Sequence, residues 1–188
     1  LNYKEKVENS FQQVTNPDPK LILFLITYYL YFQHWEEMIV MMETYLSEII
    51  KDSNKSYFSL ITRLADSKLT PEILSFQQRQ RLESLFKQSV IPNPSETDFP
   101  YYHWGVVLEK IGSFGESLKY YQRYALIQNQ SKLQNFARQR WLAVKKKQAL
   151  YLQKQGEKDQ AKNLEKEFNR RAKSWQIDPR KVNLTPPQ

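Results

Sequence analysis

Apolar residues along the chain recur three and four positions apart, and strict alternation of apolar and polar residues is lacking. Such spacing places the apolar residues on one side of an α-helix. The chain also lacks the Asn-Gly, Asp-Gly and Gly-Gly pairs that close tight β-hairpins. The pattern therefore predicts an all-α protein.

One helix start is marked by Asp18 and Pro19. A short polar side chain caps the first turn of a helix, and proline fits the first helical position because no N–H group is needed there. The apolar residues that follow predict a helical segment over residues 18–51, with a break near Gln33 and His34.

A second start of the same kind lies at Thr70 and Pro71, and it predicts a helix over residues 71–88. Before it, a break at residues 52–54 is followed by another helical pattern. The side chains expected to face inward in this part of the chain are Tyr57, Leu60, Ile61, Leu64, Leu74, Leu82, Leu85 and Phe86.

Two prolines lie two positions apart within residues 91–97. Each biases the residue before it toward an extended backbone, so a helix does not continue through this stretch. We therefore expect a linker here, between degenerate helical hairpins in residues 1–90 and a C-terminal region over residues 98–178. Residues 179–188 predict a flexible tail.

The C-terminal region shows four helical segments. Apolar spacing predicts helices over residues 100–110, 116–128 and 132–154, and a further helix after Gly156. The side chains expected to face inward from the last two helices are Leu133, Phe136, Ala137, Trp141, Val144, Tyr151, Leu152, Ala161, Leu164, Phe168, Ala172 and Trp175.

Residues 98–131 carry a recurring set of large and small positions: Tyr101, Trp104, Gly105, Leu108, Gly112, Phe114, Ser117, Tyr121 and Tyr124. This set resembles the tetratricopeptide repeat, a helix–turn–helix unit of about 34 residues. Gly105 stands at the small position where two helices approach closely, and Gly112 stands at the turn. Residues 142–179 and 19–52 match in part. The next turn glycine lies 44 positions after Gly112, so one extended helix must absorb the excess over a single repeat.

The resemblance implies a right-handed stack of antiparallel helical hairpins, a tetratricopeptide-like α-solenoid. Hairpins of this kind bury their apolar sides only by stacking, and the stack leaves a concave groove that is the usual binding surface. On the family register, the groove candidates are Tyr102, Glu109, Lys110, Lys146, Gln153 and Lys154. Tyr102 and Val106 stand where some members carry the Lys and Asn that grip a terminal carboxylate, which argues against such a clamp. The alternative is that these residues are ordinary solvated surface.

Positive charge is concentrated toward the C-terminus. Residues 1–118 hold 11 Lys/Arg and 15 Asp/Glu, a net charge of −4, whereas residues 119–188 hold 17 and 5, a net charge of +12. A basic region attracts nucleic acid or anionic surfaces. The candidate patch, near Trp141 and Trp175, is Arg138, Arg140, Lys145, Arg170, Arg171 and Lys173. The alternatives are a solvated helix surface for the charges and core packing for the two tryptophans.

The composition gives little indication of a catalytic site or a metal-binding site. The chain has no cysteine and only 2 histidines, which excludes disulfides and thiolate sites and leaves little for a histidine metal site. Residues 34–37 lack the second histidine of a zinc-binding HExxH motif, and the 4 glycines form no phosphate loop. We expect no enzymatic activity, no metal and no cofactor.

The longest apolar run, residues 21–32, covers 12 residues, whereas a membrane-spanning helix needs about 20. It predicts a buried helix and a soluble chain without a membrane span. The first residue is Leu rather than Met, which predicts a piece of a longer protein. The compartment and the oligomeric state are not predicted.

These features predict a non-enzymatic scaffold or adaptor domain that binds a protein or peptide of unspecified identity. The first alternative is binding of nucleic acid or an anionic surface through the basic region. The second is a structural spacer or dimerisation module that needs only the exposed ends of the stack.

Overall fold

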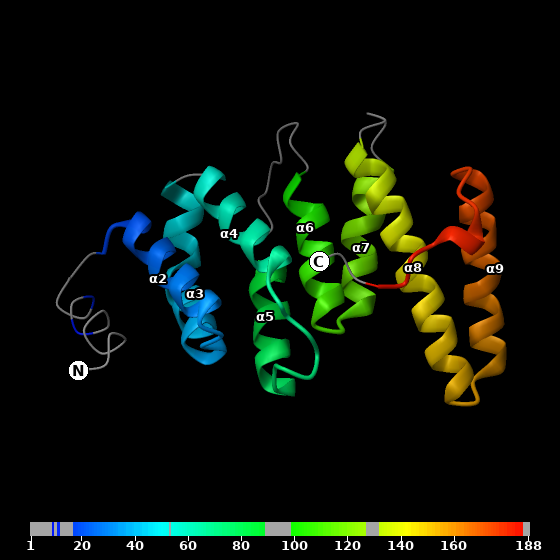
Figure 1. The fold of residues 1–188 in the computed structure, drawn as a ribbon, viewed down its shortest axis with the longest axis horizontal. Helices are drawn as coiled ribbons and strands as arrows, with labels where there is room; N and C mark the ends of the chain where they lie inside the picture. The colour runs from blue at the N-terminus through cyan, green and yellow to red at the C-terminus, as the bar shows by residue number, and fades with distance from the viewer. Residues whose placement is uncertain are drawn as a thin grey trace. The chain divides into compact units, whose positions relative to one another are not determined.

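The computed structural model describes residues 9, 11, 17–52, 54–88, 99–126 and 132–185, and all regular structure in these ranges is helical. This confirms the all-α prediction. The helices are α2 (Pro19–Tyr31), α3 (Trp35–Asp52), α4 (Asn54–Asp66), α5 (Phe76–Gln88), α6 (Phe99–Lys110), α7 (Phe114–Ala125), α8 (Lys132–Lys154), α9 (Lys158–Ser174) and the short 3₁₀ helix η1 (Pro179–Lys181) (Figure 1).

The chain forms two compact units, residues 1–60 and 61–188. Their boundary lies within α4, and the linker predicted at residues 91–97 lies outside the described residues. Residues 61–88 belong to the second unit because their side chains pack onto its later helices. The Phe86 ring lies 6.0 Å from the Trp104 ring, and Ser113 donates a hydrogen bond to Glu83. A proline pair reports local backbone geometry, whereas a unit boundary depends on these longer-range contacts.

In the first unit, α2 packs against α3. The Asp18 carboxylate accepts a hydrogen bond of 2.7 Å from the Lys20 N–H group, so the predicted cap is confirmed. The predicted break is confirmed as well, since α2 ends at Tyr31 and Gln33 adopts a positive φ of 60°. The helix pair buries Ile22, Leu25, Ile26, Met38, Ile39 and Met42.

Helix α5 begins at Phe76 rather than at the predicted Pro71. The Ser75 hydroxyl accepts a hydrogen bond from the Gln78 N–H group, and the Gln78 side chain accepts one from the Ser75 N–H group. This reciprocal pair is a capping box, which satisfies two N–H groups at once. It outcompetes the cap at Thr70, and the residues between form a turn.

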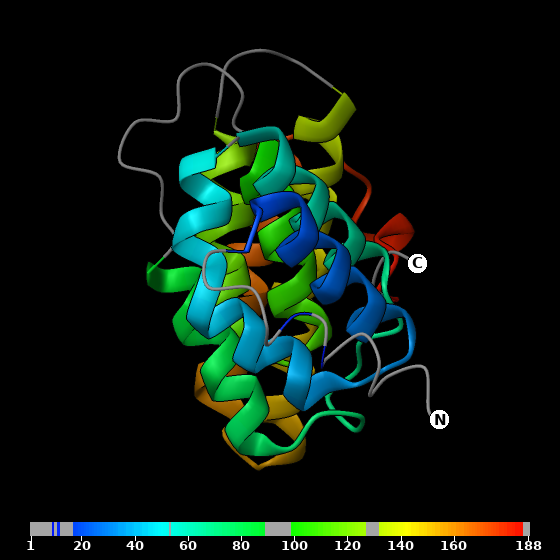
Figure 2. The same ribbon diagram turned by 90° about the vertical axis from the view of Figure 1, so that its left-hand side faces the viewer.

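In the second unit, α6 packs against α7, α7 against α8, and α8 against α9. Figure 2, taken at right angles to Figure 1, likewise draws the regular structure of the described residues as helices. Gly112 and Gly156 have φ of 81° and 84°, a left-handed backbone that glycine adopts without strain. They join α6 to α7 and α8 to α9, as the predicted turns required.

The residues expected to face inward are buried for the most part, including Tyr57, Leu60, Ile61, Leu64, Leu74, Leu82, Leu85 and Phe86. Phe136 and Tyr151 on α8 are exceptions, because both are exposed. Consecutive helical residues lie about 100° apart, so Phe136 turns outward where Ala137 turns inward. Tyr151 and Leu152 are separated in the same way.

No helix in the described ranges combines the length and apolar character needed to cross a lipid bilayer. The predicted absence of a membrane-spanning segment agrees with this finding.

Candidate functional site

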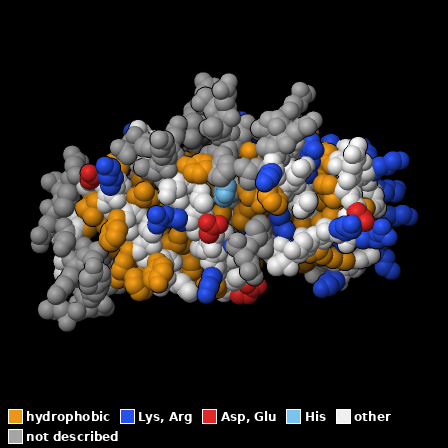
Figure 3. Space-filling model, turned by 45° about the horizontal axis from the view of Figure 1, so that its top comes forward, with side chains coloured by type: hydrophobic (Ala, Val, Ile, Leu, Met, Phe, Trp, Pro, Cys, Tyr) orange, Lys and Arg blue, Asp and Glu red, His pale blue; other side chains and the backbone are white. Residues whose placement is uncertain are grey.

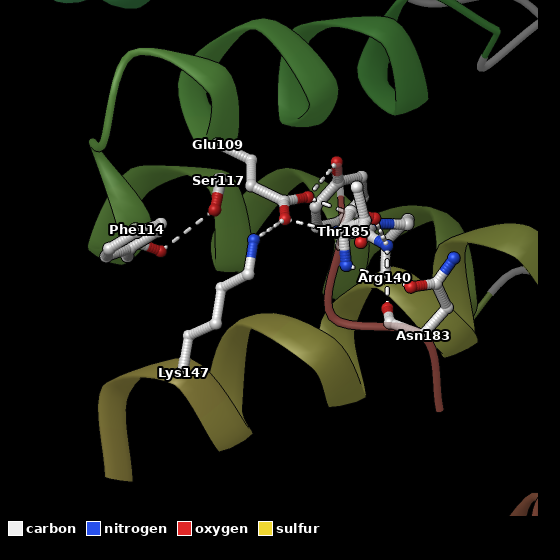
Figure 4. A network of polar contacts seen from close by, with 8 residues as sticks. Glu109, Phe114, Ser117, Arg140, Lys147, Asn183 and Thr185 are labelled. Carbon is white, nitrogen blue, oxygen red and sulfur yellow. Dashed lines mark hydrogen bonds and ion pairs between the residues drawn. The ribbon is translucent and has the colours of Figure 1, made fainter. Parts of the chain in front are cut away.

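A buried carboxylate, Glu109 near the end of α6, lies at the centre of a polar cluster (Figure 4). Its Oε2 atom accepts hydrogen bonds from the Tyr121 hydroxyl at 3.0 Å and from Arg140 Nε at 3.1 Å. Its Oε1 atom accepts from Arg140 Nη2 and from Lys147 Nζ, the latter at 2.7 Å. We refer to Glu109, Tyr121, Arg140 and Lys147 as the Glu109 cluster.

Three consecutive helices position the Glu109 cluster: α6 carries Glu109, α7 carries Tyr121, and α8 carries the two cations. Arg140 and Lys147 are seven residues apart, which is about two helical turns, so both project from the same side of α8. Gly105, one turn before Glu109, lets the Tyr121 ring lie directly against α6. A β-carbon at position 105 would lie only 2.6 Å from Tyr121 Cε1.

The charges of the Glu109 cluster do not cancel. A buried carboxylate requires ionic or hydrogen-bonding partners, and Glu109 is only 2% exposed. One carboxylate faces two cations, which leaves one positive charge in excess. Burial alone lowers the pKa of Arg140, but the hydrogen bond and the charge of Glu109 outweigh it and raise that pKa. The guanidinium therefore remains a permanent hydrogen-bond donor.

The Tyr121 phenol is also held in its protonated form. Burial raises its pKa well above the usual value of 10.0, and the nearby Glu109 charge raises it further. Because the protonated phenol is the donor in the bond to Glu109, both effects preserve the geometry of the cluster. Tyr121 and two nitrogens of Arg140 are bonded to Glu109, and Arg140 Nη1 donates to other oxygen acceptors.

Arg140 also holds a segment of the chain that comes 43 residues later. Its Nη1 atom donates hydrogen bonds to the main-chain oxygens of Asn183 at 2.9 Å and Thr185 at 2.7 Å. After α9 and η1, the chain turns back across α8 (Figure 1), and Val182 is buried. We call residues 182–185 the tail segment.

Residues 179–185, most of the tail predicted to be flexible over residues 179–188, have a defined place in the structure. Residues 179–181 form η1, whose start is capped by the Asp178 carboxylate. The Asn183 side chain accepts a hydrogen bond of 2.9 Å from the Thr185 N–H group. These contacts could not be inferred from proline content, because they depend on Arg140. Residues 186–188 lie outside the described residues.

Three of the groove candidates are interior residues. Tyr102, Glu109 and Lys110 are 9%, 2% and 7% exposed, so the expectation that they line an open groove needs correction. Tyr102 packs against Tyr121 of α7, and Glu109 contacts both α7 and α8. Burial raises the pKa of Tyr102 and lowers that of Lys110. Lys110 Nζ donates to the main-chain oxygens of Ala65 at 2.6 Å and Ser67 at 2.9 Å, where it caps the end of α4.

The other three groove candidates lie apart from the Glu109 cluster. Lys146 is half-buried with its Nζ atom 5.8 Å from the centre of the Phe168 ring, beside a pocket of about 170 Å³. Gln153 and Lys154 are exposed near the end of α8. The structure therefore does not bring the six groove candidates together on one surface.

The predicted basic patch is divided in the same way. Arg140 belongs to the Glu109 cluster, and Lys145 pairs with Glu167 at 2.8 Å. The guanidinium carbons of Arg138 and Arg171 both lie 5.8 Å from the centre of the Trp175 ring. The remaining two candidates, Arg170 and Lys173, are exposed, and the nearby Trp141 is a core residue.

A different basic surface is present on α9. Lys158, Lys162, Lys166 and Arg170 are exposed and follow one another at intervals of four, which places them along one side of the helix. Within the described part of the chain, none of them has an ionic partner. Blue side chains gather in Figure 3 at the right-hand end, where Figure 1 places α9. The spacing of four was the sequence signal for this stripe, and the patch prediction missed all but Arg170.

Over the residues that the structure describes, no group of three or more His, Asp or Glu side chains is arranged to hold a metal ion. A scan against protein-family models, a search of curated proteins and a search of solved structures each returned no match. The resemblance to tetratricopeptide repeats therefore remains a prediction from the sequence.

Proposed function

We propose that this chain is a non-enzymatic binding module, a scaffold or adaptor that holds a peptide segment of a protein partner at the Glu109 cluster. The observation that carries this proposal is the pair of hydrogen bonds from Arg140 Nη1 to two main-chain oxygens of the tail segment. A surface that already holds one irregular segment through its backbone has the chemistry to hold another.

The fold class within this proposal is the right-handed stack of antiparallel hairpins implied by the resemblance to tetratricopeptide repeats. Packing between helices that are neighbours in sequence supports it, because such stacks are held together by contacts between adjacent units. The close approach of Tyr121 to Gly105 and the left-handed backbone of Gly112 are further support, since the repeat pattern expects small residues there.

The main-chain contacts suggest how selective the module is. A carbonyl oxygen is present in every residue, so Arg140 by itself selects backbone shape rather than side-chain identity. Glu109 holds the Arg140 guanidinium in place. The Arg140 side chain therefore loses little conformational entropy when a peptide binds. Selectivity must then come from the side chains that flank the two carbonyl groups.

The test is selection of peptides from a random display library against the intact chain, followed by photo-crosslinking of the selected peptides. We expect the crosslinks to map to α6 and α8, and to disappear in Arg140→Met but not in the matched surface variant Arg170→Met. Circular dichroism of both variants serves as the folding control. Crosslinks confined to other helices, or failure to select any peptide against a chain in which Arg140 Nη1 is accessible, would refute the proposal.

A second candidate function is binding of nucleic acid or another anionic polymer along α9. The four exposed cations at intervals of four favour it. Neutralising phosphates releases counterions, so affinity should fall steeply with salt. We expect Lys162→Glu combined with Lys166→Glu to weaken binding to a single-stranded oligonucleotide and to flatten its salt dependence. If the wild-type chain shows no salt-dependent binding, this function is excluded.

A further inference from the structure

The tail segment is bound where the proposed function places a partner peptide. We infer that the tail segment is an internal ligand that must leave Arg140 before a partner binds, and that the partner presents the same chemistry. That chemistry is an apolar anchor followed directly by an Asn-stabilised turn that directs two carbonyl groups at Arg140. This inference rests on the proposed function and adds to it the class of ligand and its regulation.

The hydrogen-bonding capacity of Arg140 explains why the two ligands exclude each other. Its Nε and Nη2 atoms are occupied by Glu109, and Nη1 donates to both tail carbonyls. The Arg140 side chain is only 8% exposed, so water has little access to Nη1 while the tail segment is in place. A second peptide reaches this nitrogen only if the tail carbonyls leave it.

The conformation of the tail segment defines the ligand chemistry. The hydrogen bond between the Asn183 side chain and the Thr185 N–H group bends the backbone, and this bend brings carbonyl groups two residues apart to the same nitrogen atom. Val182, just before the bend, is 8% exposed, whereas the side chains of Asn183 and Thr185 point to solvent. The ligand is therefore recognised by one apolar side chain and by backbone shape.

Electrostatics favour acceptor groups at this position. The Glu109 cluster carries one positive charge in excess, and the negative ends of two carbonyl dipoles lie against it. Within residues 182–185, two hydrogen bonds from Arg140 and the burial of one side chain, Val182, attach the tail segment to the rest of the second unit. Contacts this few permit local opening without unfolding of the helices beneath.

The experiment measures fluorescence polarisation of a labelled peptide with the sequence of residues 178–185, titrated with the full chain. Val182→Asp in the chain removes the apolar anchor and releases the tail segment, while Lys181→Asp changes an exposed neighbour and is the matched control. If the tail segment is docked about 90% of the time, its release strengthens apparent affinity about tenfold. We expect this gain in Val182→Asp and wild-type affinity in Lys181→Asp.

Two further arms keep the outcome clear. Asn183→Gly in the chain breaks the turn at an exposed side chain without touching the core, so it tests release even if Val182→Asp fails to fold. We expect it to strengthen peptide binding as well. The same two substitutions are also made in the peptide. The Val182→Asp peptide should not bind the chain, and the Asn183→Gly peptide should bind more weakly than the unchanged peptide.

The outcomes separate the inference from the proposed function. Equal affinity of the peptide for the wild-type chain and both release variants would overturn the internal-ligand inference and leave the binding module standing. If library-selected peptides bind at Arg140 but the residue 178–185 peptide does not, the proposed ligand chemistry is wrong. If no peptide of any sequence crosslinks near Arg140 even in the release variants, the proposed function fails as well.

Discussion

Substitution of Gly105 by alanine should destabilise the second unit through the packing beneath the candidate site. The added β-carbon would lie 2.6 Å from Cε1 and 2.7 Å from Cδ1 of Tyr121, distances that real contacts do not reach. Tyr121 has no room to swing away, because its ring is fully buried and its hydroxyl is bonded to Glu109. The clash must therefore displace the ring or separate α6 from α7.

The expected magnitude follows from two destabilising effects and one stabilising effect. Overpacking of a core costs about 1–3 kcal/mol, and displacement of Tyr121 weakens a hydrogen bond to a charged group worth about 1.5–3 kcal/mol. Alanine recovers up to about 1 kcal/mol through its higher helix propensity. We expect Gly105→Ala to lower the free energy of unfolding by about 1–3 kcal/mol.

The assay is urea unfolding followed by circular dichroism and by tryptophan fluorescence, since buried Trp104 and Trp141 report on the second unit. Gly115→Ala is the matched control, because a β-carbon there has no neighbour within 4 Å. The control should be neutral or more stable by up to about 1 kcal/mol. If Gly105→Ala is as stable as Gly115→Ala, the close approach of Tyr121 to α6 is wrong.

Three further variants probe the interior of the second unit. Glu109→Gln leaves Arg140 without its charged partner. We expect the free energy of unfolding, measured by urea titration, to fall by about 3–5 kcal/mol. A loss below about 1 kcal/mol would contradict the buried ion pair. Lys110→Met removes two hydrogen bonds to the end of α4 and should cost about 1–3 kcal/mol, whereas Lys154→Met, on the exposed end of α8, should change stability by less than about 0.5 kcal/mol. Burial, reinforced by the charge of Glu116, raises the pKa of Tyr120 from 10.0 to about 12, so stability present below pH 10 should fall as pH rises from 10 through 12. The ionisation of Tyr120 should appear as a late rise in absorbance at 295 nm in the wild type that is missing in Tyr120→Phe. If the two proteins give the same titration curve at high pH, the raised pKa of Tyr120 is wrong.

The positions of most helices could be predicted from the sequence. The bounds of α8 agree with the predicted residues 132–154, because apolar residues at helical spacing continue up to the turn glycine, Gly156. The start of α5 was missed because two local caps compete, and the capping box at Ser75 has two hydrogen bonds where the cap at Thr70 offers one. The prediction rested on Thr70 and Pro71 alone and did not include the capping box at Ser75.

The candidate site was predicted only in part. Glu109 and Arg140 were both singled out, but as members of different surfaces, and their 31-residue separation hid the ion pair between them. Helical periodicity shows which side of a helix is polar, but not which neighbouring helix covers it. The docking of Asn183 on Arg140 spans 43 residues and depends on the turn after α9, so no local pattern reports it.

Thiol labelling at position 182 tests the central claim most directly. The chain has no cysteine, so Val182→Cys introduces a single thiol in the docked tail segment, and Lys173→Cys provides an exposed reference. We predict that the thiol at position 182 reacts with an aromatic disulfide reagent at least about tenfold more slowly than the reference, as expected for a site that reacts through local opening. The added substitution Asn183→Gly should abolish this protection. Equal reaction rates at positions 182 and 173 in the otherwise unchanged chain would contradict the docked tail segment, which is the observation that carries the proposed recognition of peptides by Arg140.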